Sequence, residues 1–422
     1  MGLGPSGVQA RDMTTIDPAE CQATYRQVLA EPRFRLLFAT RSLAIAADTL
    51  RIVALSILVF GLTGSPLLAA VTYGIGFAPQ AVGGTLLGAL ADRVRPRQLI
   101  TTGYSLEAAT AAALALAGLP VWASLALVAV VAGLTPVFGG ASSRLVAEVL
   151  TGDAYVLGRS LSNIAASAAQ LLGLAAGGIT VATLGARHAL LVTAGCHLAA
   201  GAAVRLRLPD LAVGRELAGP PRRSVLLQSL TGSRLLITDS AVRALMLAHW
   251  LPAAFVTGAE SLIVPYVALR GLPVGSAGLL LACLPVGMIA GDLVVGRLLR
   301  PRTRERLTMP LMVTCGLPLL AFAASPPLPV VAAVLVITGA GLAYTLGIQR
   351  RFLEAVPEPM LGQAFGLQST GLMTLQGVGP AVFGAVGQAI SAGPAMAIAG
   401  AATVMVGLAL GQRLLRYRPS AC

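Results

Sequence analysis

Three charged residues lie close together in the first long apolar stretch of the sequence, where charge is otherwise rare. Arg41, Asp48 and Arg51 stand at positions i, i+7 and i+10, a spacing that places them on one face of a helix. Asp48 lies about twelve residues into that helix, near the centre of a bilayer at about 1.5 Å per residue. A carboxylate at this depth can bind and release a proton during transport, whereas a permanent Asp–Arg pair would only fix packing. The sequence leaves both interpretations open, together with an exchange of partners between Asp48 and Arg51.

Other ionisable and amide side chains also fall inside apolar stretches, where such groups normally face a cavity or a partner. The remaining acids of this kind are Glu107, Glu260 and Asp292. Each of them could line a cavity or form a structural ion pair. Asp292 lies near the cytoplasmic end of its predicted span, and Glu260 lies toward the outer end of its own. The amides, which serve interhelical hydrogen bonding or substrate contact, are Gln80, Asn163, Gln170, Gln368 and Gln376. His197 and His249 are candidate protonation sites, although a lone membrane histidine more often only packs.

A dense charged stretch, GALADRVRPRQLI at residues 88–100, separates two apolar stretches. Gly88 allows close helix approach, and Asp92 can accept hydrogen bonds from free N–H groups at a helix N-terminus. Arg93 and Arg97 are expected to reach Glu148, at the end of a later apolar stretch. Such contacts hold in one arrangement of two rigid halves and break in the other, so they predict a gate. The simpler interpretation is that these arginines only set membrane topology.

The elements that must position these residues are membrane-spanning helices. Of the 422 residues, 56% are hydrophobic and 11% are charged, and the mean hydropathy is +0.81. A soluble chain would carry about a quarter charged residues, and about 20 apolar helical residues cross a bilayer. The sequence therefore predicts an all-α integral membrane protein with twelve spans, at residues 36–62, 66–90, 98–118, 120–143, 159–184, 186–207, 241–269, 273–297, 306–324, 328–348, 361–390 and 393–415.

The net charge of +13 indicates membrane topology and not a nucleic-acid partner, because the arginines gather in alternate connections. By the positive-inside rule these connections are cytoplasmic, and twelve spans then place both termini in the cytoplasm.

The chain contains no lysine, which excludes a P-loop and ATP bound to it. The five cysteines are scattered without a CxxC pair and predict neither a disulfide framework nor a metal site. The first 32 residues lack the apolar region of a signal peptide. No cofactor is expected.

The chain divides into two similar halves. The predicted parts are a cytoplasmic tail (1–35), a six-helix bundle (36–207), a linker with an interfacial helix (208–240), a second six-helix bundle (241–415) and a tail (416–422). Three weak similarities recur at an offset of 206 to 208 residues. Gly88-x-Leu90 matches Gly296-x-Leu298, and Arg144 with Glu148 matches Arg350 with Glu354. Residues 171–178 match residues 377–384, which include Gly379 and Pro380. Together they favour a duplicated unit with the substrate path between the repeats.

The stretch at 88–100 resembles the cytoplasmic signature between helices two and three of the major facilitator superfamily, Gly-x-Leu-Ala-Asp-Arg-x-Gly-Arg-(Lys/Arg). It departs from that signature at Arg95 and Pro96. Residues 41–70 and 144–178 are similar to the branch of macrolide-efflux and enterobactin exporters. The resemblance implies a monomer that works by rocker-switch alternating access, with Asp292, Arg350 and Glu354 in a second inner gate. Antiporters of this superfamily often carry Gly-Pro-x-x-Gly-Gly in helix five; Gly173, Gly177 and Gly178 match this motif, while Leu174 replaces the proline.

The expected function is export of a hydrophobic or amphipathic small molecule in exchange for protons, across the cell inner (cytoplasmic) membrane. Because of Leu174, proton-coupled uptake or the flipping of a lipid-like metabolite stays open as an alternative. A polytopic membrane enzyme would need a cluster such as HxxxxD or DDxxD, which the sequence lacks. A scaffold without transport would not carry intramembrane charge on several helices. The charge of the substrate is open, because both acids and arginines are available.

Overall fold

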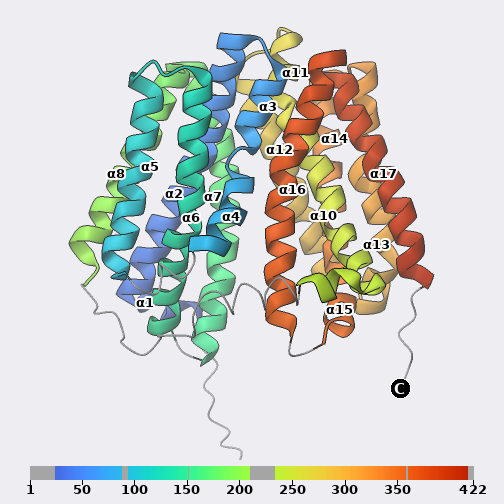
Figure 1. The fold of residues 1–422 in the computed structure, drawn as a ribbon, viewed down its shortest axis with the longest axis horizontal. Helices are drawn as coiled ribbons and strands as arrows, with labels where there is room; N and C mark the ends of the chain where they lie inside the picture. Colours follow the sequence, from blue (N-terminus) through green and yellow to red (C-terminus); the bar gives the residue numbers. More distant parts are fainter. Residues whose placement is uncertain (1–23, 88–93, 151, 210–232, 358–359, 417–422) are drawn as a thin grey trace, which may run out of the picture.

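Two bundles of helices stand side by side in the computed structural model, which describes residues 24–87, 94–150, 152–209, 233–357 and 360–416 (Figure 1). Within these ranges the chain forms helices and turns, with no strand. The first bundle contains α1 (Tyr25–Ala30), α2 (Pro32–Thr63), α3 (Pro66–Gly74), α4 (Phe77–Leu87), α5 (Pro96–Leu116), α6 (Val121–Val149), α7 (Gly152–Leu184) and α8 (Ala186–Arg207).

The second bundle begins at residue 240, after a short helical segment at 233–238. Several of its spans are built from two or more consecutive helices. Its elements are α10 (Ser240–Ser261), α11 (Ile263–Leu269), α12 (Gly275–Leu293) with the π-helical turn η2 (Val294–Leu298), α13 (Pro301–Gly316) with the 3₁₀-helix η3 (Leu317–Ala324), α14 (Leu328–Gly341), η4 (Leu342–Tyr344), α15 (Thr345–Ala355), α16 (Leu361–Ile390) and α17 (Ala392–Arg416).

Each of the twelve predicted spans corresponds to a helix or a run of consecutive helices. Eleven of the described segments are long and apolar enough to cross a membrane. The remaining predicted span is α16, whose 30 residues are rich in glycine and amides. This helix lies where the two bundles meet and packs against α3, α4 and α10. A helix that faces a partner bundle and a cavity need not be apolar all round, which accounts for its composition.

The second predicted span is broken between α3 and α4, which the sequence pattern of one continuous apolar run did not indicate. Pro79 has no N–H, so the carbonyl of Ile75 lacks the donor that a continuous helix would give it. Gly74 ends α3 against Pro380 of α16, and a Cβ at Gly74 would lie 2.7 Å from the Pro380 Cγ. The break therefore sits at a close contact between the bundles.

The two ends of the bundles differ in their connections. All six described residues with positive φ lie in the connections that follow odd-numbered spans: Gly64, Gly118, Gly185, Gly271, Ser325 and Ser391. Gly64, at φ 61°, and Gly271, at φ 63°, need the left-handed conformation that glycine adopts without strain. We call this the short-turn end. The opposite end carries Arg97, Arg144, Arg205, Arg297 and Arg351, and we call it the arginine-rich end.

The bundles meet at two helix crossings toward the short-turn end, and we call this contact the seam. At one crossing, a Cβ at Gly178 of α7 would lie 2.7 Å from the Gly278 Cα of α12. At the other, a Cβ at Gly384 of α16 would lie 2.8 Å from the Ala70 Cβ of α3. The positions at the two crossings differ by 206 and 208 residues, the offset found in the sequence. The two crossings thus occupy equivalent places in the two halves.

The seam is closed in this structure. Ser65 donates a hydrogen bond to Gln388 Oε1 at 2.8 Å, joining α3 to α16 beside the short turns. One buried apolar cluster contains side chains of both bundles, among them Val53 and Leu174 from the first and Leu262 and Phe383 from the second. Burial of these side chains and the close glycine contacts stabilise the closed seam together.

Replacing Gly178 with valine is expected to open the seam. The added side chain overlaps the Gly278 backbone, and overpacking of this kind costs about 1–3 kcal/mol, or about 5- to 150-fold in the closed-to-open ratio. Distances between spin labels on the two bundles at the short-turn end measure that ratio. Gly195→Val is the matched control, because a Cβ at Gly195 meets nothing within 4 Å. An unchanged ratio in Gly178→Val would show that this crossing does not hold the seam.

Candidate functional site

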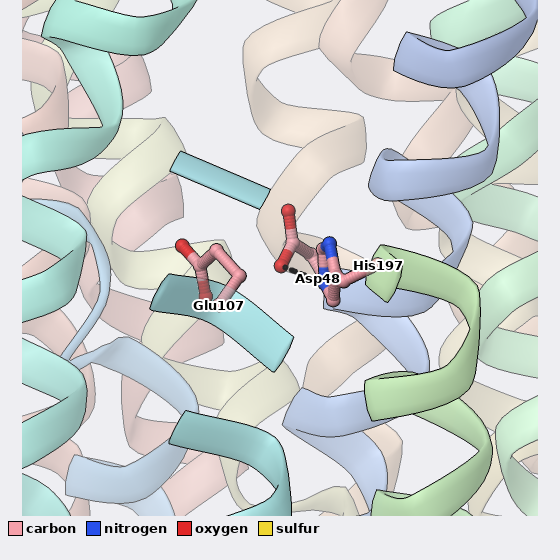
Figure 2. Close-up of side chains that lie close together, drawn as sticks. All are labelled: Asp48, Glu107 and His197. Carbon is pink, nitrogen blue, oxygen red and sulfur yellow. Dashed lines mark ion pairs between the residues drawn. The ribbon is translucent and has the colours of Figure 1, made fainter. Parts of the chain in front are cut away.

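Four ionisable side chains from three helices of the first bundle form a buried cluster: Asp48 and Arg51 of α2, Glu107 of α5 and His197 of α8. Arg51 Nη2 lies 3.2 Å from Asp48 Oδ1 and 3.4 Å from Glu107 Oε2. His197 Nε2 lies 3.3 Å from the same Asp48 oxygen. Figure 2 shows the imidazole of His197 directed at Asp48, with Glu107 nearby on the neighbouring helix. We call these four residues the charge cluster.

The cluster forms because α8 packs against both α2 and α5 along its length and so brings the three helices together. Asp48 and Arg51 are at i and i+3 on α2, so one helical turn brings them together. Small residues permit the close approach of the other helices. A Cβ at Gly103 of α5 would overlap the Phe138 ring, and a Cβ at Gly201 of α8 would lie 3.3 Å from the Tyr104 Cβ.

The hydrogen-bonding capacity of the charge cluster is only partly used. Thr135 of α6 donates to Glu107 Oε1 at 3.3 Å, and Arg51 donates to Asp48 Oδ1. Arg51 Nε and Nη1, Glu107 Oε2 and both ring nitrogens of His197 have no hydrogen-bond partner of suitable geometry. Buried polar groups are normally satisfied, and a protein that leaves several unsatisfied in one place usually has a functional reason. The cluster can therefore accept further partners, such as a proton.

The charges of the cluster do not balance. With His197 neutral, two carboxylates pair with one guanidinium, which leaves one negative charge without a paired cation among side chains that are largely buried. Arg41 lines the same small cavity but forms no ion pair within 4 Å with either carboxylate among the described contacts. The Arg51 and Glu107 side chains are 10% and 8% exposed, and that of Asp48 is 29% exposed. A net charge is expensive at this depth. Binding one proton would neutralise the cluster, so its composition is that of a one-proton site.

The donor set of the cluster also has the composition of a metal site. One oxygen or nitrogen of Asp48, Glu107 and His197 each lie within 4.8 Å of one another, and two carboxylates with an imidazole suit divalent transition metals. Arg51 argues against this interpretation, because its guanidinium already lies within ion-pair distance of both carboxylates. A divalent cation would have to displace or repel it.

A cavity of about 530 Å³ lies beside the cluster, between α2, α4, α6 and α7 of the first bundle and α16 of the second. It extends from the middle of the helices to the arginine-rich end. Its walls are mixed apolar and polar, with aromatic rings, hydroxyls, amides and two arginines. The residues that carry this character are Phe34, Phe38, Arg41, Ser42, Gln80, Thr85, Ser142, Ser143, Arg159, Ser162, Asn163, Ser369 and Thr370. Its size is typical of sites for small organic molecules.

The cavity communicates with the charge cluster through shared lining residues. Arg41 and Thr135 line both the large cavity and a small one of about 30 Å³ that contains Asp48, Glu107 and His197. Gln80 and Thr135 likewise connect it to a second small cavity, of about 80 Å³, beside Arg51. A ligand in the large cavity is thus separated from the cluster by single side chains.

The five predicted amides fall into different places. Gln80 and Asn163 line the large cavity, and Gln80 also donates to the Gly76 carbonyl at 2.7 Å. Gln376 donates to Thr257 Oγ1 at 3.5 Å, which joins α16 to α10. At Gln368 it is the backbone carbonyl, and not the side-chain amide, that accepts from Trp250 Nε1 of α10 at 2.8 Å. Gln170 is exposed on α7, away from the lining of the large cavity.

Glu260 lies apart from the charge cluster, on α10 at the seam. Its side chain is buried, and Tyr73 of α3 lies close to it from the other bundle. Asp292, in contrast, is exposed near the arginine-rich end of α12. The structure therefore places Glu260 between the bundles, as a residue near an outer gate would be.

The predicted inner gate is only partly visible. Gly88, Asp92 and Arg93 lie outside the described residues, as does the side chain of Arg350. The expected contact of Arg97 with Glu148 is replaced by others: Arg97 Nη2 donates to the Arg205 carbonyl at 2.5 Å. Glu148 pairs with Arg144, one turn earlier on α6, at 2.8 Å.

The second half contains an arginine–carbonyl contact similar to that of Arg97, at the arginine-rich end of the eighth span. Arg304 of α13 donates to the carbonyls of Gly296 and Leu299, at the end of the eighth span. Glu354 is exposed on α15, and Arg351 beside it lies 3.8 Å from Glu305 of α13. In both halves an arginine therefore binds backbone carbonyls at the end of a neighbouring span.

The predicted glycine motif packs helices. Cβ atoms at Gly173 and Gly177 would meet Thr49 and Val53 of α2, inside the first bundle, whereas Gly178 meets α12 across the seam. In the second half, Gly379 packs against the Ala254 carbonyl of α10, and Pro380 packs across the seam against Gly74. The motif thus fixes both the bundle and the seam.

Sequence reasoning missed Thr135 and gave little weight to His197. Thr135 precedes Pro136 within an apolar run, and a polar side chain beside a helix-interrupting proline was the available signal. The hydroxyls of the cavity wall gave no separate signal, because serine and threonine are common in membrane helices.

Comparisons with known proteins agree with this architecture. Residues 37–352 match the sequence model of the Major Facilitator Superfamily. The chain is 28% identical over 331 residues to the multidrug efflux pump Tap of Mycolicibacterium fortuitum, covering 73% of this chain and 77% of that pump.

Solved structures share the fold at low sequence identity. The nucleoside transporter NupG gives a TM-score of 0.72 at 14% identity, covering 92% of this chain and 100% of its own. A bacterial homologue of the human lysosomal transporter Spinster, in an inward-facing and occupied conformation, gives a TM-score of 0.62 at 14% identity, covering 90% and 94%.

Proposed function

The chain belongs to the major facilitator superfamily of transporters, and from this premise we propose that it exports a hydrophobic or amphipathic small molecule in exchange for protons. The observation that carries the proposal is the charge cluster beside the large cavity. One proton neutralises it, and a cationic or hydrogen-bond-donating group of a ligand is drawn to the same carboxylates. Because the two compete, the binding of one disfavours the binding of the other, which is the linkage that exchange requires.

The closed seam and the cavity at the other end correspond to one of the two arrangements of alternating access. Because the positive-inside rule favours arginine on the cytoplasmic side, we take the arginine-rich end, with both termini, to face the cytoplasm, so that the cavity would receive ligands from inside the cell. In the other arrangement the seam opens and the arginine-rich end closes. The similarity to a multidrug efflux pump supports the outward direction of transport.

A second candidate is proton-coupled uptake of an anion. The walls of the large cavity contain Arg41 and Arg159 and no carboxylate among the residues that line it. A proton added to the charge cluster would favour an anion bound at these arginines. Proton and anion would then bind together and move together, down the proton gradient into the cell.

Everted membrane vesicles with an acidic interior and a pH-sensitive dye separate the two candidates. Export by exchange predicts that some hydrophobic or amphipathic compounds, added outside, release the interior protons only when the protein is present. Uptake predicts no such release, and predicts instead that anions entering right-side-out vesicles make the medium more alkaline. If compounds bind the protein but move no protons in either assay, proton coupling is excluded.

A further inference from the structure

Glu260 occupies an unusual position at the seam. It lies next to the last residue of α10, within the apolar cluster that joins the two bundles, and it is 8% exposed. Tyr73 of α3, also 8% exposed, faces it from the opposite bundle. The contact therefore exists only while the seam is closed.

No cation among the described residues is placed to neutralise Glu260. Residues 361–410, which form α16 and most of α17, contain no charged residue or histidine, and the same is true of α3. On α10 itself, Arg243 and His249 lie about three turns or more from Glu260. Directly after α11, Arg270 donates to the Tyr266 hydroxyl at 2.8 Å and to the Pro326 carbonyl.

The more distant charged groups have other partners or positions. On α2, the Arg51 guanidinium is held between Asp48 and Glu107 in the charge cluster. The arginines of α13 and α15 lie at the arginine-rich end of the bundle. Tyr73 is thus the titratable side chain that faces Glu260, and it is a neutral hydrogen-bond donor.

An ionised carboxylate in this setting would be buried without a counter-charge, whereas the protonated acid would be neutral and could hydrogen-bond Tyr73. Opening the seam separates α3 from α10 and exposes Glu260 to solution at the short-turn end. The proton occupancy of Glu260 and the closure of the seam must therefore be linked, because each favours the other.

We propose that Glu260 is a second proton-binding site, separate from the charge cluster, and that a proton bound there holds the short-turn end closed. The proposal deepens the proposed function and rests on it for the direction in which the proton moves. An outward-open molecule would take up a proton at Glu260 from the external solution and then close the seam around the neutral acid. Return to the inward-facing state would in this way depend on external acid.

Spin-label distances test the proposal without a ligand. The labels are placed by Leu116→Cys and Val330→Cys, exposed positions at the short-turn ends of α5 and α14, in a background without the native cysteines. In the wild-type background, the ratio of the closed population to the open population, read from the distribution of label distances, is expected to fall at least about ten-fold from acidic to alkaline pH. In Glu260→Gln, which carries a permanently neutral amide, the seam is expected to stay closed at every pH.

Three further variants make the outcome decisive. Glu305→Gln changes an acid of the same bundle, on α13 at the arginine-rich end and paired with Arg351, and is expected to retain the pH dependence. Tyr73→Phe is expected to shift the midpoint pH while retaining the transition. Asp48→Asn is expected to retain the pH dependence of the closed-to-open ratio even if it abolishes transport. A failure of this proposal can therefore be distinguished from a failure of the proposed function. A wild-type seam insensitive to pH, or an unchanged transition in Glu260→Gln, would overturn the proposal.

Discussion

Asp48→Asn is expected to reduce proton-coupled transport by about ten-fold or more, equivalent to at least about 1.4 kcal/mol. The variant leaves Glu107 and Arg51 as a balanced pair of charges, 3.4 Å apart. A balanced cluster gains nothing by binding a proton, so the exchange loses the group that carries it. Asp48 is also the more exposed of the two acids of the cluster, and it lines the small cavity that borders the large one.

The measurement is the rate of ligand-induced proton release from everted vesicles containing equal amounts of folded protein. Glu305→Gln is the matched control, since it also converts an acid to an amide but lies on α13, paired with Arg351 outside the first bundle. The control is expected to transport at the wild-type rate. Proton release by Asp48→Asn at that same rate would show that the Asp48 carboxylate is not required.

Arg51→Gln is expected to cause the largest loss of stability. Arg51 is the one described cation within 4 Å of Asp48 and Glu107, apart from the imidazole of His197. Removing one partner of a buried ion pair costs about 3–5 kcal/mol, because the remaining charges stay buried without compensation. Here two carboxylates would be left to repel each other, and one of them would have to bind a proton.

The thermal midpoint of the purified protein in detergent measures this loss, compared across a double-mutant cycle with Glu107→Gln. The double variant removes one positive and one negative charge, so it is expected to recover part of the stability lost in Arg51→Gln. Loss of stability that is simply additive in the two single variants would contradict a direct interaction between Arg51 and Glu107.

Much of the fold was predictable because the bilayer constrains it strongly. A spanning helix must satisfy its backbone internally and present an apolar surface, so runs of about 20 apolar residues mark the spans. The repeated offset of 206 to 208 residues likewise predicted two related halves, and the Gly178 and Gly384 crossings agree with it. The break between α3 and α4 was missed, since apolar composition continues through Gly74 and Phe77.

The site was predictable only where it is local in sequence. Asp48 and Arg51 share one helical turn, so their spacing predicted that they interact. The approach of Glu107 and His197 depends on how α8 packs against α2 and how α5 packs against α8, which small residues far apart in the chain decide. The expected contact of Arg97 with Glu148 is absent in this arrangement, where Arg97 binds the Arg205 carbonyl and Glu148 pairs with Arg144.

The most direct test of the account is proton release on ligand binding by the purified protein in weakly buffered solution. A compound that the vesicle assay identifies is added, and a pH indicator counts the protons while ligand fluorescence or calorimetry reports binding. The charge cluster predicts about one proton released per ligand bound by the wild type, and none by a variant with both Asp48→Asn and Glu107→Gln that still binds the ligand. Equal release by wild type and variant, or proton uptake on binding, would contradict exchange through this cluster.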